Sequence, residues 1–141
     1  MELRSIFQSV IALHQEELPL SLKNRKQLLP INKDSIVTVT GIRRCGKSSL
    51  LALTINRLLQ NGVRPEQILY IGFDDERFAS MQTSDFDEIL QAYREMYPTQ
   101  SLKDVYMFFD EIQLIEGWEI FVLRVFKNYC KHIYITGSTA K

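Results

Sequence analysis

Residues 41–48 have the types and the spacing of a phosphate-binding loop. They read Gly-Ile-Arg-Arg-Cys-Gly-Lys-Ser, which matches the pattern G-x-x-x-x-G-K-S. Glycines let the backbone approach a phosphate closely, and successive N–H groups converge on the anion at the start of a helix. In this chemistry Lys47 contacts the β- and γ-phosphates, while the Ser48 hydroxyl ligates Mg²⁺. The loop therefore predicts a nucleoside triphosphate site.

The segments beside this loop predict the strand and the helix that it needs. The β-branched run at 35–40 favours a strand, and a helix is expected from Gly46 to Asn61, with Gly62 as its C-terminal cap. The residues expected to contact the nucleotide are Gly41, Arg44, Cys45, Gly46, Lys47, Ser48 and Ser49. Instead of contacting the phosphates, the side chains of Arg43 and Arg44 could point away from them and bind neighbouring carboxylates.

A second group that could do chemistry is the pair Asp110-Glu111. It follows the apolar run 105–109, which is typical of a strand covered on both faces. The carboxyl ends of parallel strands line the ligand crevice of an α/β sheet. Asp110 can orient Mg²⁺ there, and Glu111 can polarise a water aimed at the γ-phosphate. The alternative is a solvated turn, but the phosphate loop in the same chain favours the pair as half of a hydrolytic site.

The strand expected at 133–136 supplies a third group. It ends in Thr136-Gly137-Ser138, where a polar side chain would lie between the acidic pair and the phosphate loop. Ser138 is the first choice for a contact with the γ-phosphate or the attacking water, and Thr136 is the second. From spacing alone, a simple Gly-Ser turn explains these residues nearly as well.

The remaining candidates carry weaker chemistry. Residues 74–76, Asp-Asp-Glu, could support the metal shell or form a solvated acidic loop, and His14 and His132 are interpreted as structural or exposed. Asn32-Lys33-Asp34 resembles a guanine-recognition motif, but it lacks the spacer residue and precedes the phosphate loop, so GTP specificity is unsupported.

Strands and helices alternate along most of the chain. Strands are expected at 35–40, 68–73, 105–109 and 133–136, and helices at 3–17, 46–61, 84–97 and 118–129, with Ser84 capping the third of these helices. This alternation predicts an α/β fold with a parallel sheet and helices on both of its faces.

Composition limits the partners and the location. The 141 residues contain 17 Lys plus Arg and 17 Asp plus Glu, so zero net charge gives no overall electrostatic case for a nucleic acid or an anionic membrane. No apolar run approaches the about 20 residues that span a bilayer, and the start lacks the form of a secretory signal. Two cysteines give neither metal spacing nor a disulfide framework. We expect a cytoplasmic protein with no membrane partner.

Three segments together carry a family resemblance. GIRRCGKSSLL, YMFFDEIQ and ITGS resemble the Walker A, Walker B and sensor motifs of prokaryotic AAA-like P-loop ATPases, over about residues 20–140. The resemblance implies ATP and Mg²⁺ as cofactors, with Lys47 and Ser48 as phosphate and metal residues. It also implies that Asp110 is the Walker B acid, Glu111 the catalytic glutamate and Ser138 the first sensor. The implied fold has three layers, with strand order 1-4-3-2 and a fifth strand beside the first.

The resemblance further implies parts that would follow residue 141. Related proteins continue with the fifth strand, a helical lid and a C-terminal region, so we expect an N-terminal fragment. It would consist of a helix and connector at 1–34 and an ATPase core at 35–141, truncated before the lid. The first strand would then have an open edge, and a homo-oligomer through the ATPase face is one interpretation.

Three functions fit these residues. The first is an AAA-like ATPase that couples Mg-ATP turnover to a partner. The second is a nucleotide-gated switch with little turnover, and the third is a small-molecule phosphotransferase. Asp110-Glu111 favours hydrolysis over transfer, because a kinase positions an acceptor rather than water. The client, whether protein or nucleic acid, is not identified by the sequence.

Overall fold

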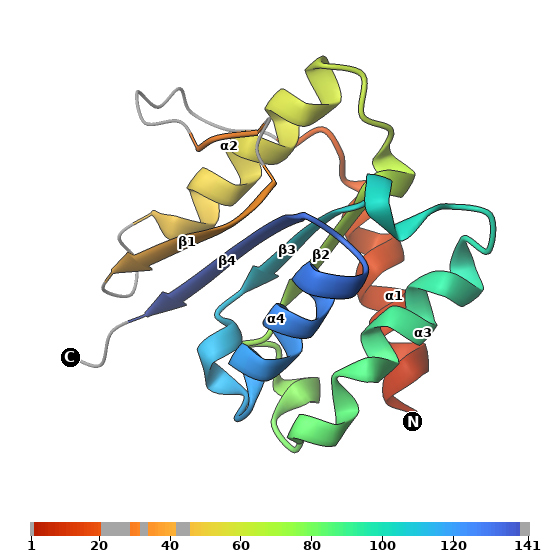
Figure 1. Ribbon diagram of the computed structural model, residues 1–141, viewed down its shortest axis with the longest axis vertical. Coiled ribbons are helices and arrows are strands. Elements are labelled where there is room, and N and C mark those ends of the chain that lie inside the picture. Colours follow the sequence, from red (N-terminus) through yellow and green to blue (C-terminus); the bar gives the residue numbers. More distant parts are fainter. Residues whose placement is uncertain (1, 21–28, 32–33, 42–45, 139–141) are drawn as a thin grey trace.

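A parallel β-sheet forms the centre of the fold in the computed structural model, which describes residues 2–20, 29–31, 34–41 and 46–138. Its strands are β1 (Ser35–Gly41), β2 (Ile68–Gly72), β3 (Tyr106–Asp110) and β4 (His132–Ser138). All neighbouring pairs are parallel, and the order across the sheet is β1-β4-β3-β2 (Figure 1). The predicted order 1-4-3-2 is therefore confirmed.

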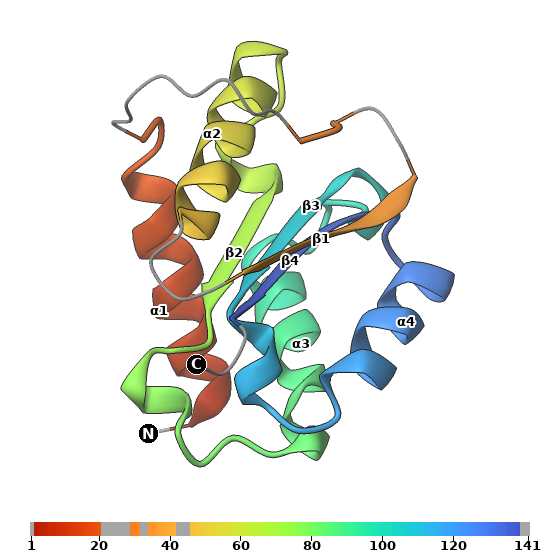
Figure 2. The same ribbon diagram turned by 90° about the vertical axis from the view of Figure 1, so that its left-hand side faces the viewer.

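Helices cover both faces of this sheet. They are α1 (Leu3–Glu16), α2 (Lys47–Gln60), α3 (Asp87–Met96) and α4 (Trp118–Asn128). Successive strand residues point to opposite faces, so Phe108 packs with α2 in one apolar cluster while Phe109 packs with α1, α3 and α4 in another. Figure 2 shows α2 on one side of the sheet and α3 and α4 on the other. The predicted three layers are confirmed.

The start of α3 differs from the prediction. Ser84 does not cap it, because Thr83–Asp85 forms a 3₁₀ turn and the α-helix begins at Asp87. The Asp85 carboxylate accepts a bond from the Gln82 N–H at 2.8 Å, and the Thr83 hydroxyl donates to the Glu116 carbonyl at 2.7 Å. These polar contacts stabilise the separate turn ahead of the helix.

Helix α1 packs against α3 and against edge strand β2. Its residues Ile6, Phe7 and Ile11 are buried in the cluster that α3 and α4 share. Near the C-terminal end of α1, the Gln15 side-chain amide donates to the Ile68 carbonyl of β2 at 3.0 Å. The N-terminal helix is thus part of the core rather than an appendage to it.

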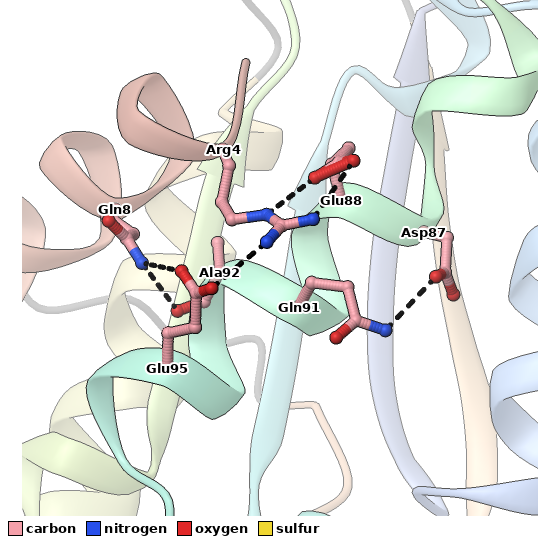
Figure 3. A network of polar contacts seen from close by, with 7 residues as sticks. All are labelled: Arg4, Gln8, Asp87, Glu88, Gln91, Ala92 and Glu95. Carbon is pink, nitrogen blue, oxygen red and sulfur yellow. Dashed lines mark hydrogen bonds and ion pairs between the residues drawn. The ribbon is translucent and has the colours of Figure 1, made fainter. Parts of the chain in front are cut away.

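A polar network joins α1 to α3 at the solvent-exposed side of their contact. Arg4 donates to Glu88 at 2.7 Å and to Glu95 at 3.0 Å, and Gln8 donates to Glu95 at 2.9 Å (Figure 3). These bonds set how the two helices lie against each other. Over the described ranges, none of the helices has the length and apolar character needed to cross a membrane.

Candidate functional site

Asp110 is the centre of the polar contacts at the carboxyl end of the sheet. Its side chain lies at the end of β3 and is only 4% exposed. One carboxylate oxygen, Oδ2, accepts bonds from Ser48 Oγ at 2.7 Å and from the Tyr70 hydroxyl at 2.6 Å. The other, Oδ1, accepts a bond from Thr136 Oγ1 at 2.5 Å. Three hydroxyl donors from three different elements therefore converge on one buried carboxylate.

The register of the sheet brings these side chains together. Phe109 pairs with Ile135, so Asp110 and Thr136, each one residue further along, leave β3 and β4 side by side. On the other side of β3, Gly72 of β2 pairs with Asp110. Ser48 reaches the same place from the first turn of α2, which follows β1.

Lys47 and Glu111 form a second contact between the phosphate loop and the strand end. The Lys47 side chain is 3% exposed, and its Nζ lies 3.8 Å from Glu111 Oε2. The same ammonium donates to the Gly41 carbonyl at 3.4 Å. Lysine is seldom buried without a partner because its charge loses hydration. The predicted phosphate-binding cation and the predicted catalytic carboxylate are thus neighbours.

Glu111 has an unusual backbone. Its φ of 56° and ψ of 39° lie in the left-handed region, and among the described residues it is the one non-glycine with positive φ. The Glu111 N–H donates to Thr136 Oγ1 at 2.9 Å, and its Oε1 accepts from Gln113 Nε2 at 2.9 Å. A non-glycine in this region costs about 1–2 kcal/mol, so the surrounding bonds must hold it there.

Thr136 is the residue that joins the two acids. Its hydroxyl donates to Asp110 and accepts from the Glu111 N–H. Thr136 is 1% exposed, so this bridge is shielded from water. From the sequence, Thr136 is the second candidate, after Ser138, for a contact with the γ-phosphate or the attacking water.

Ser138 is the last residue of β4 and pairs in register with Gly41, the last residue of β1. The side chain of Ser138 lies outside the described residues, so its contact with a phosphate stays a prediction. The predicted contacts of Arg43, Arg44 and Cys45 also fall outside the described residues.

After Gly41, the description of the loop resumes at Gly46. Gly46 has φ 92°, a conformation that favours glycine, and it stands at the N-cap of α2. Lys47, Ser48 and Ser49 then form the first turn, so the positive end of the helix lies beside the Asp110 carboxylate. A helix start of this kind is suited to bind an anion.

The acidic residues after β2 are engaged elsewhere. Asp75 caps a short turn by accepting from the Arg77 N–H at 2.9 Å, and it also pairs with the Arg77 guanidinium at 2.7 Å. The bond to the Arg77 side chain lowers the pKa of Asp75. Asp74 and Glu76 are exposed. This arrangement fits the acidic-loop alternative better than a place in the metal shell.

Two residues of the site were not singled out in the sequence. Tyr70 lies on the opposite face of β2 from Leu69 and Ile71, and the alternation of strand residues is enough to predict this face. Its bond to Asp110 depends on the register between β2 and β3, which no local pattern gives. Gln113 lies in a 3₁₀ turn after Glu111, and its spacing carries no signal of its own.

The oxygen donors here suit magnesium. Mg²⁺ prefers carboxylate and hydroxyl oxygens together with phosphate oxygens. The buried Asp110 and the exposed Ser48, which lies in the first turn of α2, supply the first two kinds of oxygen. The donor set therefore fits a Mg-nucleotide.

Comparison with known proteins adds the family. Residues 33–141 match a family model described as "AAA domain". The chain belongs to this family. AAA domains are nucleotide-binding modules of the ATPase type, and the parallel sheet with a phosphate loop after β1 agrees with that class.

Relatives of this AAA domain are longer than the chain. One, an uncharacterized protein of Haemophilus influenzae, is 37% identical over 123 residues, which are 86% of this chain and 30% of the relative. The uncharacterized protein MJ1544 of Methanocaldococcus jannaschii is 31% identical over 137 residues, which are 92% of this chain and 29% of the relative. The chain thus spans somewhat under a third of the length of each.

A solved structure is also similar to the chain. The structure of C. elegans PCH-2 has 16% sequence identity and a TM-score of 0.47, over 98% of this chain and 36% of that one.

Proposed function

We propose that this AAA domain binds Mg-ATP at the carboxyl end of its sheet and hydrolyses it. One observation carries the proposal: the phosphate-loop residues Lys47 and Ser48 directly contact Glu111 and Asp110. Thr136 ties those two acids to each other. A loop that binds phosphate, an acid for the metal and an acid for water are the parts that hydrolysis requires.

Asp110 and Ser48 would hold the magnesium ion. When bound, the ion neutralises charge on the phosphates during transfer. The residues of the chain have their own tasks in that setting. Lys47 binds the β- and γ-phosphates, and the start of α2 adds backbone N–H groups to the same anion.

Glu111 acts on the nucleophile. The triphosphate competes with the Glu111 carboxylate for the Lys47 ammonium, because the two groups are 3.8 Å apart before ATP arrives. Released from that ion pair, Glu111 orients a water and takes up its proton. The water oxygen then bonds to the γ-phosphorus as the bond to the ADP oxygen breaks. The Gln113 side-chain amide donates to Glu111 Oε1 at 2.9 Å and so orients the Glu111 carboxylate.

We further propose that turnover is coupled to a partner in the cytoplasm. Edge strand β1 pairs only with β4 in the described part of the chain, so its other edge offers backbone groups to another segment or copy. A homo-oligomer through the ATPase face is consistent with this edge. The boundary between a segment at 1–34 and the ATPase core at 35–141 also stays a proposal.

One comparison tests the function. Nucleotide affinity and phosphate release are measured for the wild type, Lys47→Ala and Glu111→Gln, in this chain and in the full product of its reading frame. We expect Lys47→Ala to weaken ATP binding at least tenfold, and Glu111→Gln to bind ATP as the wild type does without releasing phosphate. Wild-type phosphate release by Glu111→Gln in the complete protein would refute the catalytic role.

The same data distinguish the ATPase from the alternative function, a nucleotide-gated switch. A wild-type protein that binds ATP tightly, and in its complete form changes conformation without releasing phosphate, would support the switch instead. The Lys47–Glu111 ion pair is the group that ATP would break in either case.

A further inference from the structure

Tyr70 holds the same carboxylate oxygen that Ser48 holds. Its hydroxyl donates to Asp110 Oδ2 at 2.6 Å from the middle of β2, two residues before the strand ends. The phenol is the donor in this bond, because a carboxylate oxygen can only accept. The family resemblance of the sequence assigned no role to this residue.

The ring of Tyr70 is held by α1. His14 stacks on it with ring centroids 4.4 Å apart and planes inclined by 12°. Burial lowers the pKa of His14 to about 4, so the imidazole is neutral when it stacks at neutral pH. The next residue, Gln15, bonds to the Ile68 carbonyl and accepts from the Tyr97 hydroxyl. Helix α1 is thus fixed to β2 and α3 close to the tyrosine.

We propose that Tyr70 is a positioning residue for the metal-holding carboxylate of Asp110, and that His14 of α1 keeps the Tyr70 ring in place. The inference rests on the proposed Mg-nucleotide function. With Mg²⁺ bound, the Ser48 hydroxyl would serve the ion instead of Asp110 Oδ2. Each oxygen of the Asp110 carboxylate then has one donor, which is Tyr70 for Oδ2 and Thr136 for Oδ1. Together the two bonds fix the plane of the carboxylate.

Such outer partners matter to a metal site. Removing a hydrogen-bond partner of a ligating group costs roughly 10–100-fold in metal affinity. The proposal also gives α1 a part in the site, although α1 lies outside residues 33–141 that match the family. A helix that precedes the matched region would thereby set how tightly the domain binds its metal.

The test is the magnesium dependence of nucleotide binding. A fluorescent ADP analogue, mant-ADP, is titrated into the 141-residue chain at increasing Mg²⁺ and again with EDTA. Tyr70→Phe removes the hydroxyl and keeps the ring. We expect the Mg²⁺ concentration at half-maximal effect to rise about tenfold in this variant, with the metal-free affinity unchanged.

A matched control is available in the next strand. Tyr106 of β3 also stacks on a histidine, His132, with centroids 4.5 Å apart and planes inclined by 19°. Tyr106→Phe also removes a hydroxyl from a strand tyrosine that stacks on a histidine, but at the start of β3, the end away from Asp110. We expect the wild-type Mg²⁺ requirement in this control, which separates the bond to Asp110 from a general loss of packing.

A second pair of variants tests the link to α1. We expect His14→Ala to raise the Mg²⁺ requirement in the same direction, and His14→Phe to restore it because a ring again covers Tyr70. Should Tyr70→Phe not fold, this pair carries the same comparison. A wild-type Mg²⁺ requirement in folded Tyr70→Phe would overturn the inference and leave the proposed function standing. A wild type whose nucleotide affinity ignores Mg²⁺ would refute both.

Discussion

Thr136→Val tests how strongly one hydroxyl holds the two acids of the site. Valine has nearly the shape of threonine, so the substitution removes the hydroxyl and leaves the packing of β4 in place. Two bonds are lost: the bond to Asp110 Oδ1 and the bond from the Glu111 N–H. Both lie at a position that is 1% exposed, so water cannot easily replace them.

The expected cost follows from these two bonds. A hydrogen bond to a charged group contributes roughly 1.5–3 kcal/mol, and a buried N–H deprived of its acceptor costs about 1–3 kcal/mol. A newly buried methyl group offsets about 0.8 kcal/mol of this. We therefore expect the free energy of unfolding to fall by roughly 2–5 kcal/mol. Glu111 also loses a bond that holds its left-handed backbone.

The assay is urea unfolding followed by circular dichroism, with Thr54→Val as the control. Thr54 is also 1% exposed, and its hydroxyl donates to the Leu50 carbonyl within α2 at 2.8 Å. That carbonyl belongs to the helix ladder, so we expect Thr54→Val to cost under about 1 kcal/mol. If Thr136→Val costs no more than Thr54→Val, the bridge does not stabilise the site and the reasoning fails.

Two further predictions use other parts of the structure. Burial lowers the pKa of His14 from 6.5 to about 4, so below pH 6.5 the unfolded chain takes up a proton that the folded chain does not, and stability falls with falling pH. Between pH 7.5 and 5 this contributes a loss of about 2 kcal/mol, which urea titrations of His14→Phe should lack; equal pH profiles for the two proteins would contradict it. The second prediction concerns Gly137→Ala. This substitution places a Cβ 3.0 Å from Oε1 of Gln113, so we expect it to disturb the bond that Gln113 Nε2 donates to Glu111. We expect slower phosphate release with unchanged nucleotide affinity, and an unchanged rate would show that Gln113 does not direct Glu111.

The order of the sheet, and the meeting of the candidate site residues at one of its edges, could be predicted from the sequence. A glycine-rich loop between a strand and a helix, and an acidic pair after a buried apolar run, both mark carboxyl ends of parallel strands. Those ends share one edge, and the family resemblance supplied the order that makes the strand ending in Thr136 the neighbour of β3. The contacts of Ser48 with Asp110 and of Lys47 with Glu111 follow from that placement.

The choice between Thr136 and Ser138 could not be made from spacing. The two residues are two apart, so strand alternation alone does not distinguish them. The register shows where Thr136 lies, because Phe109 pairs with Ile135 and this sets Thr136 level with Asp110, while the phosphate contact of Ser138 stays a prediction. Ser138 is two residues further along and pairs with Gly41.

The contact between Tyr70 and His14 could not be predicted from the sequence for a related reason. Their contact joins a helix to a strand more than fifty residues later, and no period in either segment reports it. The late start of α3 has a local cause, since the side chain of Asp85 bonds the N–H of Gln82 and closes a separate turn. Long-range packing and side-chain competition for backbone groups both escape pattern analysis.

Asp110→Asn tests the central claim most directly, because the Asp110 carboxylate is where the phosphate loop, β2, β3 and β4 meet. Calorimetric titration of ADP with and without Mg²⁺ is compared for the wild type and this variant. We predict that Mg²⁺ tightens ADP binding in the wild type and that the Asn variant loses this gain while keeping its metal-free affinity. An undiminished Mg²⁺ effect in Asp110→Asn would contradict the account.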